Sequence, residues 1–200
     1  MSHQEKAHSA IWYVLCVVLA VVAVPSTAIT YADPFGYPDP GYVADSMDHE
    51  YCLNYVPSGD QSYAISAMEY LDNRTDLYDQ YFASCGAATD AVWISTDLEP
   101  GYRGLAPCAV WYNEVWKICD QVWLLYDYAE IYSNTISNGG DGDNYFLNLQ
   151  KTMRHELGHS VGLSHSATVD DCMRSGWVGT YLQFVSYNDH HTYDHLNSWY

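Results

Sequence analysis

The sequence predicts an α+β fold built from two amphipathic helices and several short strands. Residues 61–72 and residues 145–161 carry apolar side chains at helical spacing. The segment between them contains short runs rich in β-branched and aromatic residues, which are typical of strands. A chain of 200 residues is long enough to enclose one substantial hydrophobic core. We therefore expect a single mixed domain.

The first helix is predicted over residues 61–72, where apolar side chains recur every three or four positions. Asp60 or Ser62 would cap its start, because short polar side chains accept hydrogen bonds from the first free backbone N–H groups. The apolar positions are Ala64, Ile65, Met68 and Leu71.

Three strands are predicted over residues 91–96, 108–113 and 121–128. Each is short and contains Val, Ile, Trp or Tyr, which fit a pleated, partly buried surface. The sequence Glu99-Pro100-Gly101 separates the first two as a turn.

The second helix is predicted over residues 145–161, after a polar, glycine-rich loop at residues 137–144. Asp143 or Asn144 would cap it, and the aspartates of the loop are also candidate calcium ligands, although their spacing is not that of an EF-hand. A solvated loop is the favoured interpretation. The apolar residues of the helix are Phe146, Leu147, Leu149, Met153, Leu157 and Val161.

The N-terminus has the layout of a secretory signal peptide. Lys6 precedes an almost wholly apolar run, residues 10–24, and small residues follow it. We predict a signal peptide over residues 1–28, with cleavage near Ala28 or Ala32. The alternative is an uncleaved membrane anchor, but the run is shorter than the ~20 residues that a spanning helix needs. No stable membrane insertion is expected after cleavage.

Three of the seven prolines fall in residues 29–50, which we interpret as an irregular lead-in. The remaining residues, 51–200, would form the folded domain. A C-terminal helix is predicted over residues 186–200. Its His191 and His195 have the spacing for a second metal site, but without a third ligand a structural role is preferred.

Six cysteines occur, and Cys16 lies inside the predicted signal peptide. Export makes disulfide bonds the expected state of the others, and their odd number leaves at least one thiol unpaired within the chain. Pairing does not follow from sequence. Cys108 with Cys119 is the first candidate, because the two residues flank a strand-like segment, and Cys52 with Cys85 is the second.

The chain carries 25 acidic and seven basic residues, for a net charge of −18. Such a protein is a poor partner for nucleic acid or for an anionic membrane. The charge is most simply interpreted as a source of solubility. Twenty tyrosines are present, and we attribute them to core and sheet packing.

The chemistry is concentrated in residues 155–165, His-Glu-Leu-Gly-His-Ser-Val-Gly-Leu-Ser-His. His155 and His159 are four positions apart, so a helix presents both on one face, where two imidazoles bind one zinc ion. Glu156 is placed to reach water at that metal. Gly162 is suited to a left-handed helix end, after which the chain returns His165 as a third ligand. One coordination position stays open, which is the condition for catalysis.

This motif resembles that of the metzincin metallopeptidases, and a candidate for their Met-turn follows at residues 172–176. The resemblance implies a zincin fold: a twisted, mostly parallel sheet with two long helices, divided into an upper subdomain (51–162) and a small lower subdomain (163–200). It also implies that Met173 packs beneath the ligand imidazoles. Ser175 stands where some relatives carry a fifth, tyrosine ligand, and residues 175–178 would line a pocket for the substrate.

We therefore predict a secreted, monomeric zinc endopeptidase, with Glu156 as general base and a protein or peptide as substrate. Two alternatives belong to other classes. One is a catalytically silent zinc-containing binding protein, against which the intact Glu156 argues. The other is a tyrosine-rich surface adhesion protein in which the motif is incidental.

Overall fold

The computed structural model describes residues 40–166, 171–176, 185–187 and 195–200. The predicted signal peptide lies outside them, as do His191 and the rest of residues 188–194 of the predicted C-terminal helix. All described residues belong to one compact unit, which extends from Asp33 to Tyr200. Among the described helices, none combines the length and the hydrophobicity that a membrane span requires.

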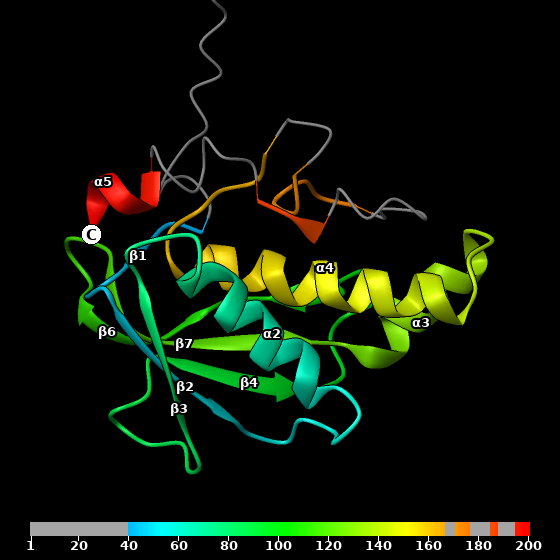
Figure 1. Cartoon of the computed structure of the whole chain (residues 1–200), viewed down its shortest axis with the longest axis horizontal. Coiled ribbons are helices and arrows are strands. Elements are labelled where there is room, and N and C mark those ends of the chain that lie inside the picture. The colour runs from blue at the N-terminus through cyan, green and yellow to red at the C-terminus, as the bar shows by residue number, and fades with distance from the viewer. Residues whose placement is uncertain (1–39, 167–170, 177–184, 188–194) are drawn as a thin grey trace, which may run out of the picture. The chain divides into compact units, whose positions relative to one another are not determined.

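A seven-stranded, mostly parallel sheet lies at the centre of this unit (Figure 1). The strand order is β1-β7-β4-β2-β3, and every pair along this path is parallel. Strands β5 and β6 pair antiparallel with β7, on the side away from β4. The strands are β1 (Val43–Ala44), β2 (Asp48–Leu53), β3 (Tyr78–Phe82), β4 (Ala91–Ser95), β5 (Gly104–Leu105), β6 (Cys108–Asn113) and β7 (Ile118–Tyr126).

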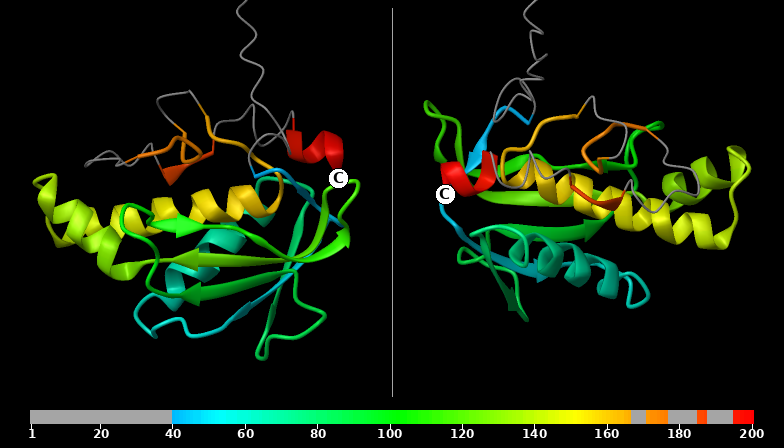
Figure 2. Two further views of the ribbon diagram at one scale, coloured as in Figure 1. Left: turned by 180° about the vertical axis from the view of Figure 1, so that it is seen from behind. Right: turned by 45° about the horizontal axis from the view of Figure 1, so that its top comes forward.

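Helices α2 and α4 pack against each other and cover one face of the sheet, as the two views of Figure 2 show. Helix α3 packs against α4 at its N-terminal end. The other face of the sheet is more open, and Trp123 of β7 is 45% exposed there. The helices are α2 (Gln61–Asp72), α3 (Tyr128–Ser137), α4 (Gly142–Ser160) and the short α5 (Asn197–Trp199).

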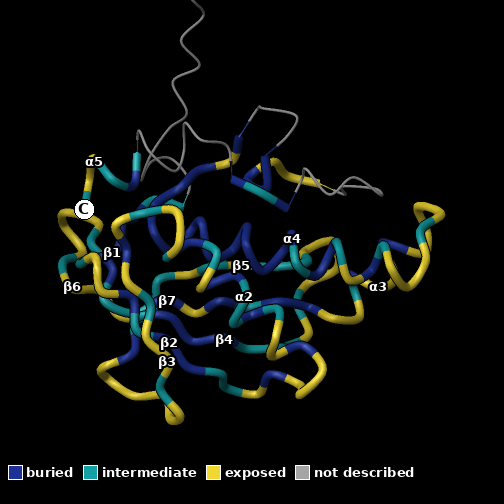
Figure 3. The backbone as a smooth tube through the Cα atoms, in the orientation of Figure 1, coloured by how far each residue is buried: buried dark blue, intermediate teal, exposed yellow. Residues whose placement is uncertain are grey.

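The core lies between α4 and the sheet (Figure 3). Leu149, Met153 and Leu157 follow one another at four-residue intervals along α4, and all three are fully buried. They belong to the same cluster as Trp93 of β4 and Leu124 of β7. This apolar stripe fixes the rotation of α4, so that His155 and Glu156 beside it face the cavity at the edge of the sheet.

The predicted helix at 61–72 and the three predicted strands are present, with small differences in their ends. The strand predicted to reach Tyr128 ends instead at Tyr126, and a helix that the sequence did not suggest, α3, follows at once. Asp127 makes this change of direction, because its Oδ1 accepts from the N–H of Glu130 and caps α3, while Oδ2 accepts from the N–H of Leu98.

Helix α4 begins earlier than predicted, and its cap is neither Asp143 nor Asn144. Asp141 is the N-cap: its carboxylate accepts from the N–H of Asn144, and the Asn144 side chain accepts from the N–H of Asp141. The predicted loop is largely exposed to solvent, as expected, and its end forms a capping box. A calcium site in this loop is not supported. Among the described residues, the side chains that cluster as potential metal ligands are those of His155, His159 and His165, which lie outside the loop.

The predicted irregular lead-in, residues 29–50, is partly wrong. Residues 29–39 are outside the described part of the chain, but β1 and the first half of β2 fall within the remainder. Strand β2 is recognised poorly in the sequence because it contains Asp48, His49 and Glu50. It forms because β3 and β4 pair with it on both sides.

Both predicted disulfide pairs are confirmed. Cys52 of β2 is bonded to Cys85 in the segment after β3, and Cys108 is bonded to Cys119 across the β6–β7 hairpin. Cys172 is the free cysteine among the described residues, and it is buried.

His49 makes the protein sensitive to acid. Burial lowers its pKa from 6.5 to about 4, and its Nε2 lies 3.0 Å from Ser160 Oγ. The pKa of His49 is lower in the folded state than in the unfolded state. The contribution of neutral His49 to the free energy of unfolding is therefore fully present above pH ~6.5 and is lost as the pH falls towards ~4. We expect the free energy of unfolding to fall by about 2 kcal/mol between pH 7 and pH 5 from this residue.

Urea titrations at both pH values check this result, with His49→Gln as the comparison. The variant is expected to show a smaller difference between the two pH values than the wild type does. Equal differences would show that His49 is not responsible.

Candidate metal centre and its cavity

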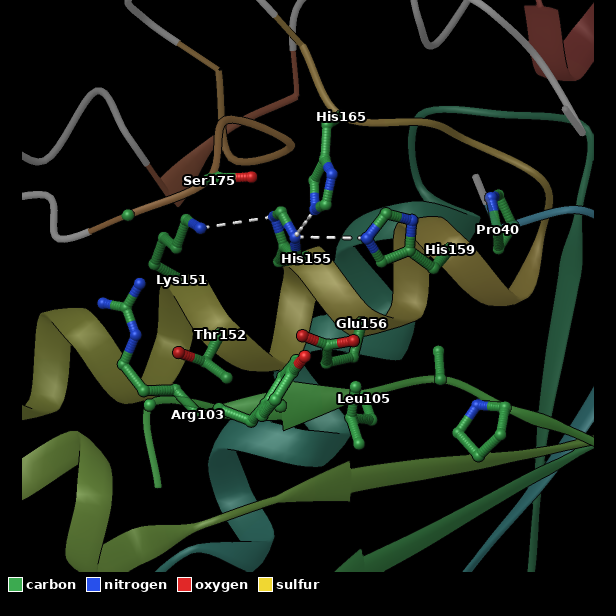
Figure 4. A pocket seen from close by; sticks show the side chains of 16 residues that line it. Pro40, Arg103, Leu105, Lys151, Thr152, His155, Glu156, His159, His165 and Ser175 are labelled. Atoms are coloured by element: carbon green, nitrogen blue, oxygen red, sulfur yellow. Dashed lines mark hydrogen bonds between the residues drawn. The ribbon is translucent and has the colours of Figure 1, made fainter. Parts of the chain in front are cut away.

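Helix α4 carries the first two histidines, and its C-terminus delivers the third. Gly162 has φ 95°, and its N–H donates to the carbonyl of His159. The N–H of Leu163 donates to the carbonyl of Gly158, so the helix ends in a Schellman motif. The chain then reverses, which brings His165 back over the helix (Figure 4).

The three imidazoles converge as the sequence predicted. His155 Nε2 lies 3.2 Å from His159 Nε2 and 3.1 Å from His165 Nε2. The three potential ligand atoms lie within 4.8 Å of one another. His155 and His159 are each 6% exposed, whereas His165 is exposed. The cluster is therefore open to solvent on the side of His165.

The orientation of two imidazoles is fixed by backbone carbonyls. His155 Nδ1 lies 2.7 Å from the carbonyl oxygen of Cys172, and His159 Nδ1 lies 2.7 Å from that of Leu163. Each Nδ1 donates to its carbonyl when it holds the ring proton, which leaves Nε2 as the ligand nitrogen. These two acceptors could not be recognised in the sequence, because both are main-chain atoms brought close by the fold.

The donor set fits zinc. Bonds of ~2.0–2.1 Å at tetrahedral angles place two ligand nitrogens about 3.4 Å apart, which is close to both observed separations. Burial lowers the pKa of His155 well below 6.5, and the charge of Lys151 adds to this effect. The neutral form that a metal requires is therefore favoured at neutral pH.

Glu156 lies between α4 and the edge strand β5, and it is only 5% exposed. Gly104 of β5 makes this approach possible, because a Cβ there would lie 2.4 Å from Glu156 Oε1. The carboxylate therefore occupies the space that a side chain at position 104 would fill. Gly104 was not recognised in the sequence as a functional residue.

The histidines and Glu156 line one cavity of about 580 Å³. Its walls come from α4, from the β5 region, and from the segment that contains Ser175 and Gly176. The resemblance to metzincins implied that residues 175–178 line this pocket; the first two do, and the other two lie outside the described residues. The lining residues are Pro40, Gly101, Tyr102, Arg103, Gly104, Leu105, Ala106, Pro107, Lys151, Thr152, His155, Glu156, His159, His165, Ser175 and Gly176.

Met173 lies beneath the histidine-bearing turn of α4. It is fully buried, and a Cβ added to Gly158 would lie 2.3 Å from its Sδ. The Met173 carbonyl accepts from the N–H of Ser166, which joins this segment to the one that carries His165. Met173 therefore packs against the turn of α4 that carries the two histidines.

Gly158→Ala is expected to destabilise the protein by about 1–3 kcal/mol. Alanine normally stabilises a helix by roughly 1 kcal/mol relative to glycine, but here its Cβ collides with Met173 and comes within 3.0 Å of Tyr187 Cε1. Urea unfolding of the variant would measure the loss. Gly142→Ala in the same helix is the control, since a Cβ there meets nothing within 4 Å. A rise in stability in both variants would contradict the expectation.

Two cations of the cavity were not recognised in the sequence as site residues. Lys151 lies one turn before His155, and its Nζ is 3.2 Å from His155 Nδ1. Burial, followed by the charge of Arg103, lowers the pKa of Lys151 to about 8, so it is mostly protonated at neutral pH. The spacing of Lys151 and His155 on one helix was visible in the sequence, but the approach of Arg103, the residue before β5, was not.

Comparison with known proteins gives a limited result. No family model and no curated protein matches this sequence. One similar solved structure is the crystal structure of archaemetzincin from Methanopyrus kandleri, which is 16% identical in sequence. The match covers 75% of this chain and 94% of that chain, with a TM-score of 0.46.

Proposed function

We propose that this protein is a secreted, zinc-dependent endopeptidase. The observation that carries the proposal is the convergence of three histidine Nε2 atoms in a cavity that Glu156 also lines. A metal site that served only structure would be closed by a fourth protein ligand. Here the three histidines are the whole cluster among the described residues, and His165 faces solvent.

His155, His159 and His165 would hold the zinc ion. Zinc at such a site activates water as a nucleophile and polarises the carbonyl of the substrate. Glu156 would accept a proton from the attacking water as general base and return it to the leaving amine. The carbonyls of Cys172 and Leu163 keep the imidazoles oriented throughout.

The edge strands support a peptide as the substrate. β5 lies on the outer side of β7 and lines the cavity next to Glu156. An extended peptide can add to such an edge through main-chain hydrogen bonds. A substrate that lies along the edge can continue past the metal site in both directions, which is the arrangement of an endopeptidase.

Export is supported by the two disulfides, because such bonds persist in oxidising compartments. Residues 1–28, which we predict to be the signal peptide, lie outside the described part of the chain.

Casein digestion with and without 1,10-phenanthroline, together with metal analysis, tests the proposal. We expect about one zinc ion per chain and cleavage that stops with the chelator and returns with added zinc. Stoichiometric zinc without cleavage of casein or of a peptide library would favour the silent binding protein instead. Absence of zinc from the purified protein would contradict both.

A further inference from the structure

Two of the few cations in this acidic protein lie together at one end of the cavity. The sequence has seven Lys and Arg residues against 25 Asp and Glu. Arg103 and Lys151 both line the cavity on the same side of His155, away from His159 and Pro40 (Figure 4). Among the described lining residues, Glu156 is the only carboxylate.

Lys151 is 4% exposed, and a charge that is buried in this way needs a good acceptor. Its Nζ lies within hydrogen-bond distance of His155 Nδ1, but that nitrogen is also 2.7 Å from the Cys172 carbonyl oxygen. When His155 binds metal through Nε2, the ring proton is on Nδ1 and donates to that carbonyl. The nitrogen then has no lone pair for Lys151, so the ammonium group needs another acceptor, and it lines the cavity from which a substrate group can supply one.

Arg103 adds a second positive charge, and the two cations repel each other across the cavity. Glu156 attracts both, but its carboxylate lies against Gly104 and is required for proton transfer. Asp171 also attracts Lys151, although its Oδ1 accepts from the N–H of Met173. A carboxylate from outside would satisfy both cations, since guanidinium binds carboxylate through two parallel hydrogen bonds.

We propose that Lys151 and Arg103 form a subsite for a substrate carboxylate next to the cleaved bond. The inference rests on the proposed peptidase function and specifies its substrate class: peptides with an acidic side chain, or a C-terminal carboxylate, adjacent to the scissile bond. The carboxylate is placed next to the cleaved bond because Lys151 lies close to the metal ligand His155. Lys151 Nζ is 3.2 Å from the ring of a metal ligand, and neighbouring residues of an extended peptide are about 3.3 Å apart along the strand.

Matched peptides test the subsite. Pairs that differ only by Asp or Asn next to the cleaved bond, with amidated C-termini, report recognition of the side chain. A second pair, with a free or an amidated C-terminus one residue after the bond, reports recognition of the terminus. The wild-type protein is expected to prefer the carboxylate in at least one pair by roughly tenfold or more in kcat/KM.

Lys151→Met and Arg103→Gln should each bring this preference close to one, and Lys151→Glu should reverse it in favour of a basic side chain. Arg174→Gln is the matched control, because Arg174 is an exposed cation next to Ser175 that does not line the cavity. It should keep the wild-type preference. A wild-type ratio near one in both pairs would overturn the subsite, as would an equal loss in the Arg174 variant.

Binding separates this inference from the peptidase proposal. Fluorescence anisotropy with labelled peptides of both pairs is measured on zinc-loaded Glu156→Ala protein. Tighter binding of the carboxylate peptide, lost in Glu156→Ala/Lys151→Met, supports the subsite even if no peptide is cleaved by the wild type. Cleavage without a carboxylate preference in either assay would keep the peptidase and reject the subsite.

Discussion

Glu156→Ala is expected to lower the rate of peptide hydrolysis by about 10²- to 10⁴-fold while the protein keeps its zinc. The factor is the usual contribution of a general acid–base group. Zinc is retained because the three histidine nitrogens and the carbonyls that orient them are unchanged. Steady-state kinetics on a quenched fluorescent peptide, with metal analysis of the same sample, measure both quantities.

Two further variants isolate the cause. Glu156→Gln keeps the shape of the side chain and removes only its ability to take a proton, so it should be as inactive as the alanine variant. Glu69→Ala removes an exposed carboxylate from α2 and should be fully active. Turnover by Glu156→Gln within tenfold of the wild type would reject Glu156 as the general base.

Gly104→Ala is expected to cost about 10²-fold in activity with little change in stability. The new Cβ would lie 2.4–2.7 Å from three atoms of the Glu156 side chain, and this flexible side chain is what must move. Moving it costs the fold little, but a general base must lie within hydrogen-bond reach of the proton it takes. Small misplacements of reacting groups are costly for catalysis.

A double-mutant cycle makes this prediction specific. In the Glu156→Ala background, Gly104→Ala should cause almost no further loss, because the group that it displaces is already absent. Gly142→Ala, where a Cβ meets nothing within 4 Å, should keep wild-type activity. Additive losses in the cycle would mean that Gly104 acts through something other than Glu156, such as the docking of substrate on β5.

The sequence predicted the elements whose signals are local. The helix at 61–72 and the strand at 108–113 follow from side-chain periodicity, and α4 follows from its apolar stripe. The convergence of the histidines was also predictable, since helical spacing brings His155 and His159 together without any other part of the fold. Gly162 supplied the turn that returns His165.

Two of the elements that could not be predicted from the sequence depend on partners distant in the chain. Strand β2 has polar residues at its start and is held by β3 and β4. Helix α3 begins where Asp127 caps it and also holds Leu98, a contact across the fold. The cap of α4 is an exception, because it is local: Asp141 rather than Asp143 caps the helix through reciprocal hydrogen bonds with Asn144, three residues on.

For this protein, the sequence by itself determined which residues form the candidate metal cluster, because all three histidines lie within residues 155–165, on one helix and its terminal turn. Only the tertiary structure decided how that chemistry is positioned. Gly104 approaches Glu156 from β5, and the Cys172 carbonyl approaches His155 from beyond the helix. Arg103 joins Lys151 at the cavity for the same reason: packing of the sheet edge on α4 creates contacts between residues far apart in sequence.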